Sequence, residues 1–352
     1  MSSLATWNGE CAVATMKDVA QAAGVSTATV SRVLNGHPAP TEQTRERVLA
    51  AIDALGYRPN TLARSLRLHT THTLGLVISD LTNPFFAEVA RAVENEAREH
   101  DYSVIVGNAN ESVEQQRRYV HTLLDRQVDG LLVCPATDEG SWLGEAAETG
   151  VPLVLLDRRI AGSVKVPVVR VDGTAALECL AAHLVELGHR RIGVIAGPAE
   201  ASTGRERLDA FAAALGSRGA PLAERMVVYG DFQQQSGATA ARTLMSGANR
   251  PTALVAMDNL MGLGALEQLR AMGFSVPGDV GLAVYDDLPW FSLLEPAITA
   301  IAQPTDDLGR AAVRALLDLI GQGNAENVVL NAELVIRSSC GERAESGRGE
   351  GV

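Results

Sequence analysis

The sequence lacks the cysteine and histidine patterns of disulfide scaffolds and metal proteins. Its four cysteines (Cys11, Cys134, Cys179 and Cys340) lie far apart and form no CxxC pair. Such spacing is typical of reduced, mostly packed thiols in a cytosolic protein. None of the seven histidines recurs with a cysteine or carboxylate at metal-ligand spacing. We therefore expect neither a metal site nor another cofactor.

Catalytic and membrane signatures are missing as well. The sequence has no GxSxG, no Walker loop, no GxGxxG after its first strand and no HExxH. No stretch approaches the ~20 apolar residues of a membrane span. Residues 1–15 lack the basic start and apolar run of a signal peptide. We expect a cytoplasmic protein that is not an enzyme, with residues 1–15 as a disordered extension and Met16 as an alternative start.

Length and charge indicate more than one domain with different partners. The 352 residues exceed one ordinary domain and indicate two or three. The net charge is −12, yet the stretch from Lys17 to Arg67 contains seven basic and four acidic residues. A small basic head on an acidic body fits a protein that contacts DNA with one end only.

Residues 16–35 carry the pattern of a helix-turn-helix. Two short helical segments flank Gly24, and Ser26 stands where an N-cap residue of the second helix belongs. In this motif the second helix enters the major groove, and here it carries small or polar residues and one long donor, Arg32. The alternative is a three-helix bundle whose second helix only packs. A third helix is predicted over 41–56, with Thr41 as its cap, and the head ends near residue 58.

Residues 59–72 form a linker in which a short helix is predicted over 61–68. About two turns of helix are unstable alone in water, so the segment is either a plain linker or a helix that folds only when held. Asn60 can cap this helix, and Leu66 with its neighbouring arginines suits the minor groove, where apolar side chains part base steps. We include Asn60 and Leu66 among the candidate DNA-binding residues.

From residue 73 to 340 strands and helices alternate, which predicts an α/β body of two doubly wound parallel-sheet subdomains. We expect the N-subdomain over about 73–166 plus 303–330, and the C-subdomain over about 167–302 plus 331–340. Residues 341–352 are rich in Gly, Glu and Arg and are expected to be disordered. In open parallel sheets ligands bind at the carboxyl ends of strands, so a cleft between the halves is the predicted site.

Aromatic residues make up only 4% of the chain, yet several follow predicted strands together with Asp, Arg, Asn and Gln. Flat rings that stack on C–H faces, next to polar groups that bind adjacent hydroxyls, suit a sugar. Each residue alone could simply satisfy loop backbone, but their coincidence favours a sugar site. The strand-end candidates are Asp80, Asn83, Phe85, Phe86, Asp157, Arg158, Arg205, Phe232, Asp258, Tyr285, Asp286 and Gln303.

With both halves in view, the sequence resembles the lactose-repressor family of bacterial transcription factors. The motifs that carry the resemblance are DVAQAAGVSTATVSRVLNG, LGYRPN, LARSL, SDLTNPFF, LDRR, LAAHLVELGHRRI, AMDNLMGLGA and LAVYDD. The resemblance implies a homodimer that binds an operator, with a hinge helix that folds on DNA and inserts Leu66 into the minor groove. It assigns base reading to Thr27, Ala28 and Arg32, and phosphate contacts to Thr29 and Ser31.

Within the body the resemblance is closest to ribose-type members, and it implies sugar contacts from nine residues. Met257 departs from the family, which usually has Asn there, so an amide is replaced by a thioether. The change favours a deoxygenated, bulkier or less polar ligand than ribose, or it is only a changed contact. The nine implied sugar contacts are Asn83, Phe85, Phe86, Asp157, Arg158, Arg205, Phe232, Asp286 and Gln303.

The sequence thus predicts an operator-binding repressor that is switched allosterically by a small sugar or sugar-like effector in the cleft. The alternative is a solute receptor for sugar uptake, which the body alone would allow. Because the tail has no leucine heptads, we expect a dimer rather than a tetramer.

Overall fold

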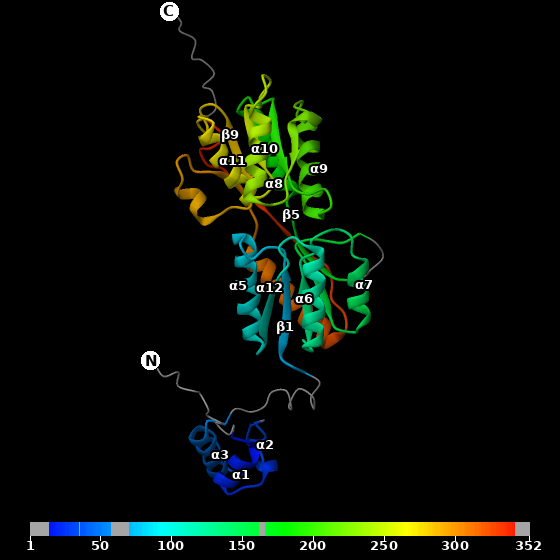
Figure 1. The fold of residues 1–352 in the computed structure, drawn as a ribbon, viewed down its shortest axis with the longest axis vertical. Helices are drawn as coiled ribbons and strands as arrows, with labels where there is room; N and C mark the ends of the chain where they lie inside the picture. Colours follow the sequence, from blue (N-terminus) through cyan, green and yellow to red (C-terminus); the bar gives the residue numbers. More distant parts are fainter. Residues whose placement is uncertain (1–13, 35, 58–69, 162–165, 342–352) are drawn as a thin grey trace, which may run out of the picture. The chain divides into compact units, whose positions relative to one another are not determined.

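The computed structural model describes residues 14–34, 36–57, 70–161 and 166–341 (Figure 1). The chain divides into two compact units, residues 1–71 and 72–352. The predicted hinge helix, with Asn60 and Leu66, lies outside the described residues. Among the helices that are described, none combines the length and apolar character needed to cross a membrane.

The described residues of the first unit form three helices: α1 (Met16–Ala23), α2 (Thr27–Leu34) and α3 (Glu42–Leu55). Helix α1 begins with a capping box, in which the Thr15 hydroxyl accepts from the Asp18 amide and the Asp18 side chain accepts from the Thr15 amide. It ends at Gly24, whose φ of 64° is the left-handed conformation that glycine adopts without strain. The Ser26 hydroxyl then accepts from the Thr29 amide at 3.1 Å, as the predicted cap of α2 requires.

The core of this unit is small and packs mainly alanine and valine. Val48 and Ala51 of α3 and Tyr57 after it are buried in this core, whereas Leu55 is 40% exposed. The predicted N-cap of α3 is correct: the Thr41 side chain accepts from the Thr44 amide. The buried residues of the core are Val19, Ala20, Ala23, Val30, Val33, Val48, Ala51 and Tyr57.

The second unit contains two six-stranded sheets, and this confirms the predicted doubly wound body. The first sheet has the order β11-β5-β4-β3-β1-β2 and the second β12-β10-β9-β8-β6-β7. Every strand pair is parallel except β10 with β12. The strands are β1 (Thr73–Ile78), β2 (Ser103–Asn108), β3 (Gly130–Val133), β4 (Leu153–Leu156), β5 (Val168–Asp172), β6 (Ile192–Ala196), β7 (Val227–Tyr229), β8 (Ala253–Ala256), β9 (Gly281–Tyr285), β10 (Thr299–Ala302), β11 (Val328–Asn331) and β12 (Glu333–Val335).

Helices cover both faces of each sheet, as parallel connections require (Figure 1). Two short 3₁₀ segments, Glu224–Met226 and Pro289–Leu293, complete the second subdomain. The helices are α5 (Pro84–Glu99), α6 (Val113–Asp125), α7 (Ser141–Glu148), α8 (Thr174–Glu186), α9 (Ser202–Ser217), α10 (Gln234–Met245), α11 (Asn259–Ala271) and α12 (Thr305–Gln322).

The predicted boundary between the halves near residue 167 is wrong by one strand. Strand β5 pairs with β4 and β11, so it belongs to the first sheet, and the chain enters the second subdomain only after Asp172. It returns after β10 to form α12 and β11, then crosses once more to β12. Three chain segments therefore join the two subdomains.

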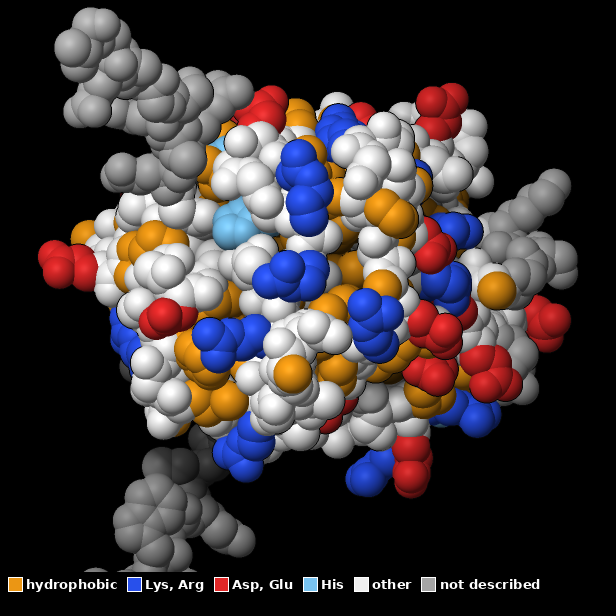
Figure 2. Space-filling model, turned by 90° about the horizontal axis from the view of Figure 1, so that it is seen from above, with side chains coloured by type: hydrophobic (Ala, Val, Ile, Leu, Met, Phe, Trp, Pro, Cys, Tyr) orange, Lys and Arg blue, Asp and Glu red, His pale blue; other side chains and the backbone are white. Residues whose placement is uncertain are grey.

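Charge on the second unit is mixed. Figure 2 shows basic side chains near the middle of one face and most of the acidic ones toward its margins. Positive charge is therefore not confined to the head, although the chain as a whole is acidic.

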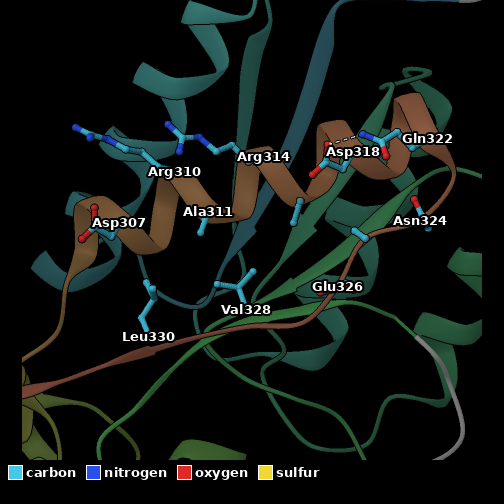
Figure 3. Close-up of a pocket in the computed structure, with 12 residues that line it drawn as sticks. Asp307, Arg310, Ala311, Arg314, Asp318, Gln322, Asn324, Glu326, Val328 and Leu330 are labelled. Atoms are coloured by element: carbon cyan, nitrogen blue, oxygen red, sulfur yellow. Dashed lines mark hydrogen bonds between the residues drawn. The ribbon is translucent and has the colours of Figure 1, made fainter.

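A groove on the first subdomain lies between α12 and β11 (Figure 3). Val328 and Leu330 of β11 point toward α12, whereas Arg310 and Arg314 extend away from them. Arg314 donates instead to Glu96 of α5 at 2.7 Å. The two arginines of α12 therefore do not point toward the apolar side chains of β11.

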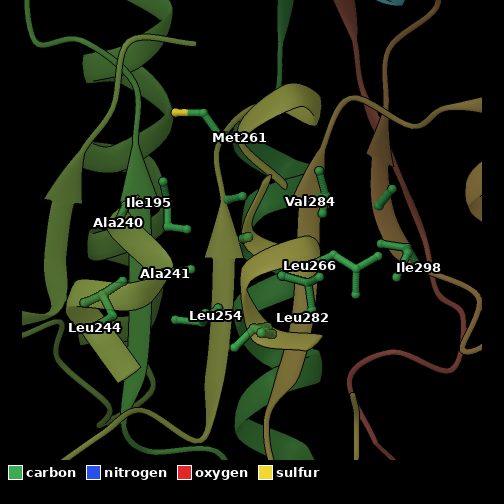
Figure 4. Close-up of a cluster of buried hydrophobic side chains, with 14 of the residues drawn as sticks. Ile195, Ala240, Ala241, Leu244, Leu254, Met261, Leu266, Leu282, Val284 and Ile298 are labelled. Atoms are coloured by element: carbon green, nitrogen blue, oxygen red, sulfur yellow. The ribbon is translucent and has the colours of Figure 1, made fainter. Parts of the chain in front are cut away.

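The second subdomain is held by a dense apolar core in which α10 and α11 pack against the sheet (Figure 4). Leu244, Leu254, Leu266 and Leu282 belong to this cluster. The two helices approach so closely that a Cβ on Gly264 would lie 1.9 Å from the Gln234 carbonyl oxygen. This packing fixes the start of α11, which carries residues of the site described next.

Candidate effector site and DNA-binding helix

The carboxyl ends of the two sheets face each other and enclose a narrow pocket. Both subdomains contribute to its wall. The lining residues are Asn83, Phe85, Phe86, Glu111, Asp157 and Arg158 from the first, and Thr203, Arg207, Phe232, Asp258 and Asp286 from the second.

Two helix starts meet across the pocket. Asn83 is the N-cap of α5 and accepts from the Phe85 amide at 3.0 Å, and Asp258 caps α11 by accepting from the Met261 amide at 2.9 Å. The Asn83 amide group also donates to Asp258 at 3.2 Å and accepts from Asn259 at 2.9 Å. The same side chains therefore begin the helices and join the subdomains.

Four pocket residues adopt a backbone conformation that is uncommon for residues with a side chain. The φ angles of Glu111, Asp157, Phe232 and Asp286 are 54°, 64°, 63° and 70°. They are half of the eight such non-glycine residues in the described parts of the chain. Left-handed conformations cluster at binding sites, where the surrounding structure holds them, and this supports the location of the site.

Arg158 lines the pocket and is 4% exposed. Its two terminal nitrogens donate to Glu111 at 2.7 and 2.8 Å, in the two-pronged geometry of strong arginine–carboxylate pairs. Its guanidinium lies 4.8 Å from the ring centroid of Phe232 and 5.9 Å from that of Phe86. The Arg158 Nε is buried without a hydrogen-bond partner, so a donor is available to a ligand.

Arg207 of helix α9 is the second arginine in the pocket wall. Its Nη1 donates to the Met257 carbonyl at 2.8 Å and lies 3.6 Å from an oxygen of Asp286. Its guanidinium covers the ring of Tyr285 at 3.7 Å. Gln303 donates to the other oxygen of Asp286. This network fixes Asp286 at the pocket.

Burial raises the pKa values of the pocket aspartates, because charged carboxylates lose hydration there. The pKa of Asp157 rises to about 6, against opposing effects of Arg207 and Arg158. The pKa of Asp258 rises to about 7 through burial and the nearby charge of Asp286. Burial also raises the pKa of Asp286 and that of Tyr285, the latter to about 12. Perturbed carboxylates in a cleft are typical of functional sites.

Eight of the thirteen candidate effector residues line the pocket, and five do not. The eight are Asn83, Phe85, Phe86, Asp157, Arg158, Phe232, Asp258 and Asp286. Tyr285 and Gln303 lie behind it and support Arg207 and Asp286. Asp80 accepts from Gln233 at 3.2 Å, across the cleft, and is a link between subdomains rather than part of the pocket wall.

Arg205 and Met257 were expected at the effector site but do not line the pocket. Arg205 lies two residues from Arg207 on α9, about 200° around the helix, and pairs with Asp138 at the rim, with its side chain 43% exposed. The Met257 side chain is fully buried in the apolar core beside Tyr285, so it does not face the ligand. The thioether therefore does not line the pocket, whereas the main-chain carbonyl of Met257 accepts from Arg207.

The sequence interpretation missed Glu111, Thr203 and Arg207. Thr203 and Arg207 are four residues apart on α9, and this spacing is the signal that identifies them as one face of a helix. No sequence signal marks Glu111, which lies in the loop after β2. Within the described residues, no three His, Cys, Asp or Glu side chains are grouped to hold a metal ion.

In the first unit, α2 presents one polar face. Val30 and Val33 are buried, whereas Thr27, Ala28 and Arg32 are the candidate base readers and Thr29 and Ser31 the candidate phosphate contacts. Of these, Thr27, Ala28 and Arg32 are exposed, and Thr29 and Ser31 are partly buried. The Thr29 hydroxyl lies 2.9 Å from that of Ser26, within the cap of the helix. The polar face is therefore available for a groove of DNA, with Arg32 as its long donor.

Comparisons with known proteins agree with both units. Residues 15–60 match the description "Bacterial regulatory proteins, lacI family". Residues 71–337 match "Periplasmic binding proteins and sugar binding domain of LacI family". The HTH-type transcriptional repressor PurR of Photobacterium profundum is 36% identical over 332 residues, which cover 93% of this chain and 98% of that protein. PurR of Klebsiella pneumoniae (strain 342) is 37% identical over 330 residues, 93% and 97% of the two chains.

Solved structures show the same relationship. A transcriptional regulator CelR–cellobiose complex is 35% identical with a TM-score of 0.71, and covers 93% of this chain and 99% of that chain. The Lac repressor dimer bound to operator and the anti-inducer ONPF is 31% identical with a TM-score of 0.84, over 94% and 100%.

The architecture and the pocket thus define a DNA-binding regulator with an effector-binding body. The chain belongs to the LacI family of bacterial regulatory proteins, which confirms the resemblance seen in the sequence. It is a helix-turn-helix transcriptional repressor that binds operator DNA and is regulated by a small effector.

Proposed function

We propose that this repressor acts as a homodimer in the cytoplasm and that its effector is a small sugar or sugar-like molecule. One observation carries the proposal: a narrow pocket joins three aromatic rings with carboxylate, amide and guanidinium groups from both subdomains. Rings favour the apolar face of a sugar, and the polar groups favour its hydroxyls.

Relatives support the same class of ligand and assembly. The CelR structure contains cellobiose, which is a sugar, and the Lac repressor structure is a dimer on its operator. The relatives named above are transcriptional repressors, which favours a regulator without catalytic activity. The rival function, a solute receptor for uptake, does not account for the helix-turn-helix unit.

The contacts between the subdomains indicate how the effector acts on DNA binding. Beside the bonds of Asn83 described above, Arg159 pairs with Glu206 at the rim, and the Arg159 amide donates to the Ser202 hydroxyl at 3.1 Å. An effector that contacts both walls changes the free energy of this closed arrangement relative to others. Linkage then transmits the same free energy to the operator-binding state.

The test is a thermal-shift screen of the full chain against pentoses, hexoses, nucleobases and nucleosides. A ligand that binds only the folded state raises the melting temperature. We expect a small sugar to give the largest shift and to change operator affinity in a DNA-binding titration. A larger shift from nucleobases or nucleosides, with none from sugars, would overturn the sugar assignment.

A direct test of the DNA-binding assignment is the variant Leu66→Ala. If Leu66 inserts between base steps, the variant weakens operator binding and leaves effector binding intact. Unchanged operator affinity would refute the role of Leu66.

A further inference from the structure

The effector pocket contains more acidic than basic side chains. Four carboxylates line it, from Glu111, Asp157, Asp258 and Asp286, but only two guanidinium groups, from Arg158 and Arg207. A negatively charged ligand needs a cation that is not already paired. The partners of the two arginines therefore decide which charge the pocket accepts.

Arg158 is fully engaged at its terminal nitrogens. Both of them donate to the Glu111 carboxylate, and Nη1 also lies 3.3 Å from the Pro135 carbonyl oxygen. The remaining donor, Nε, lies 3.8 Å from a carboxylate oxygen of Asp157. A ligand hydroxyl can accept from Nε and donate to Asp157, whereas an anionic oxygen at this position faces a second negative charge.

Arg207 is engaged as well. It donates to the Met257 carbonyl, lies beside Asp286 and covers the Tyr285 ring. Pairing Arg158 with Glu111 and Arg207 with Asp286 leaves Asp157 and Asp258 without a cation of their own. The raised pKa values of Asp157 and Asp258, caused first by burial and then in part by neighbouring carboxylates, agree with a site that disfavours added negative charge.

Building on the proposed function, we propose that the pocket selects an uncharged monosaccharide over its phosphate ester. Glu111 sets this selectivity because its carboxylate occupies both terminal nitrogens of Arg158. Arginine binds phosphate with the same two-pronged geometry that Glu111 uses here. Glu111 is the group that a phosphate would have to replace. The left-handed backbone at Glu111, with φ of 54°, holds its carboxylate at the arginine.

The experiment compares matched ligand pairs by calorimetry on the full chain: D-ribose with D-ribose 5-phosphate, and D-glucose with D-glucose 6-phosphate. For the pair whose neutral member binds, we expect the ester to bind about 100-fold more weakly, because like charges placed together in a site oppose binding strongly. Glu111→Gln removes the negative charge opposite the terminal nitrogens of Arg158, so the ratio of the dissociation constants of ester and neutral sugar should fall at least about tenfold. The control Glu114→Gln removes an equal charge from an exposed position outside the pocket and should leave the ratio unchanged.

The outcomes separate this inference from the proposed function. If the wild-type chain binds an ester as tightly as its neutral parent, the charge selectivity is refuted, and this measurement needs no variant to fold. If Glu111→Gln is folded by circular dichroism and keeps the wild-type ratio, Glu111 is not the determinant. If neither member of any pair binds while a nucleobase does, the sugar function itself fails, and this inference fails with it.

Discussion

Replacing Arg207 with alanine tests which arginine of α9 serves the effector site. Arg207 is 8% exposed, and its removal leaves the buried Asp286 carboxylate supported mainly by Gln303. Breaking a buried ion pair from one side costs about 3–5 kcal/mol of unfolding free energy. The matched control is Arg205→Ala, since that exposed rim pair with Asp138 contributes about 0–1 kcal/mol.

The two variants are compared by urea denaturation and by calorimetric titration with the sugar that gives the largest thermal shift. Losing a charged hydrogen-bond donor to the ligand or its partners costs about 1.5–3 kcal/mol, so effector affinity should fall at least about tenfold in Arg207→Ala. Arg205→Ala should change it less than about threefold. A loss of binding in Arg205→Ala with normal binding in Arg207→Ala would refute the assignment.

Three further predictions concern the carboxylates, the DNA contact and the core. Asp157→Asn should be more stable than the wild type by about 3 kcal/mol above pH 6 and equal to it near pH 4. The raised pKa of Asp157 makes the wild-type fold most stable while this carboxyl is protonated, and that stability is lost as the pH rises to about 6, whereas Asn carries no charge at any pH. Denaturation across pH 4–8 measures the difference in unfolding free energy, and a difference that stays constant with pH contradicts the prediction. Arg32→Ala should weaken operator binding by about 1–3 kcal/mol and relax base preference at one position, which a titration with operator variants measures. Equal loss of affinity for all operator variants would mean that Arg32 contacts phosphate and not a base. Gly264→Ala should destabilise the second unit by about 1–3 kcal/mol or more, because the added Cβ would overlap the Gln234 carbonyl. Urea denaturation measures this loss, and an unchanged midpoint would show that α10 and α11 can separate to admit the methyl group.

The sequence was sufficient for the fold because local patterns determine its elements. Alternating apolar strands and amphipathic helices predicted the two parallel sheets, and the cap at Ser26 with glycine at Gly24 predicted the turn of the head. The position of β5 was not predictable in this way. Its strand pattern is the same in either sheet, and only its pairing with β4 decides to which subdomain it belongs.

The site was partly predictable for a similar reason. Residues that follow strands directly, such as Asp157 and Asp286, were found because strand ends converge in parallel sheets. Arg207 was missed because the first turn of α9 decides which of its two arginines faces inward. Glu111 was missed because the direction of a loop side chain depends on a left-handed backbone that no local pattern marks.

The meeting of Asn83 and Asp258 has an electrostatic consequence. The N-terminus of a helix carries a partial positive charge, so the closed cleft brings together the positive ends of α5 and α11. The Asp258 carboxylate lies between these ends and accepts hydrogen bonds from both sides. When ionised, the Asp258 carboxylate offsets the repulsion of the two helix dipoles. Because its pKa is raised to about 7, a ligand, proton or substitution that removes this charge near neutral pH weakens the contact between the two subdomains.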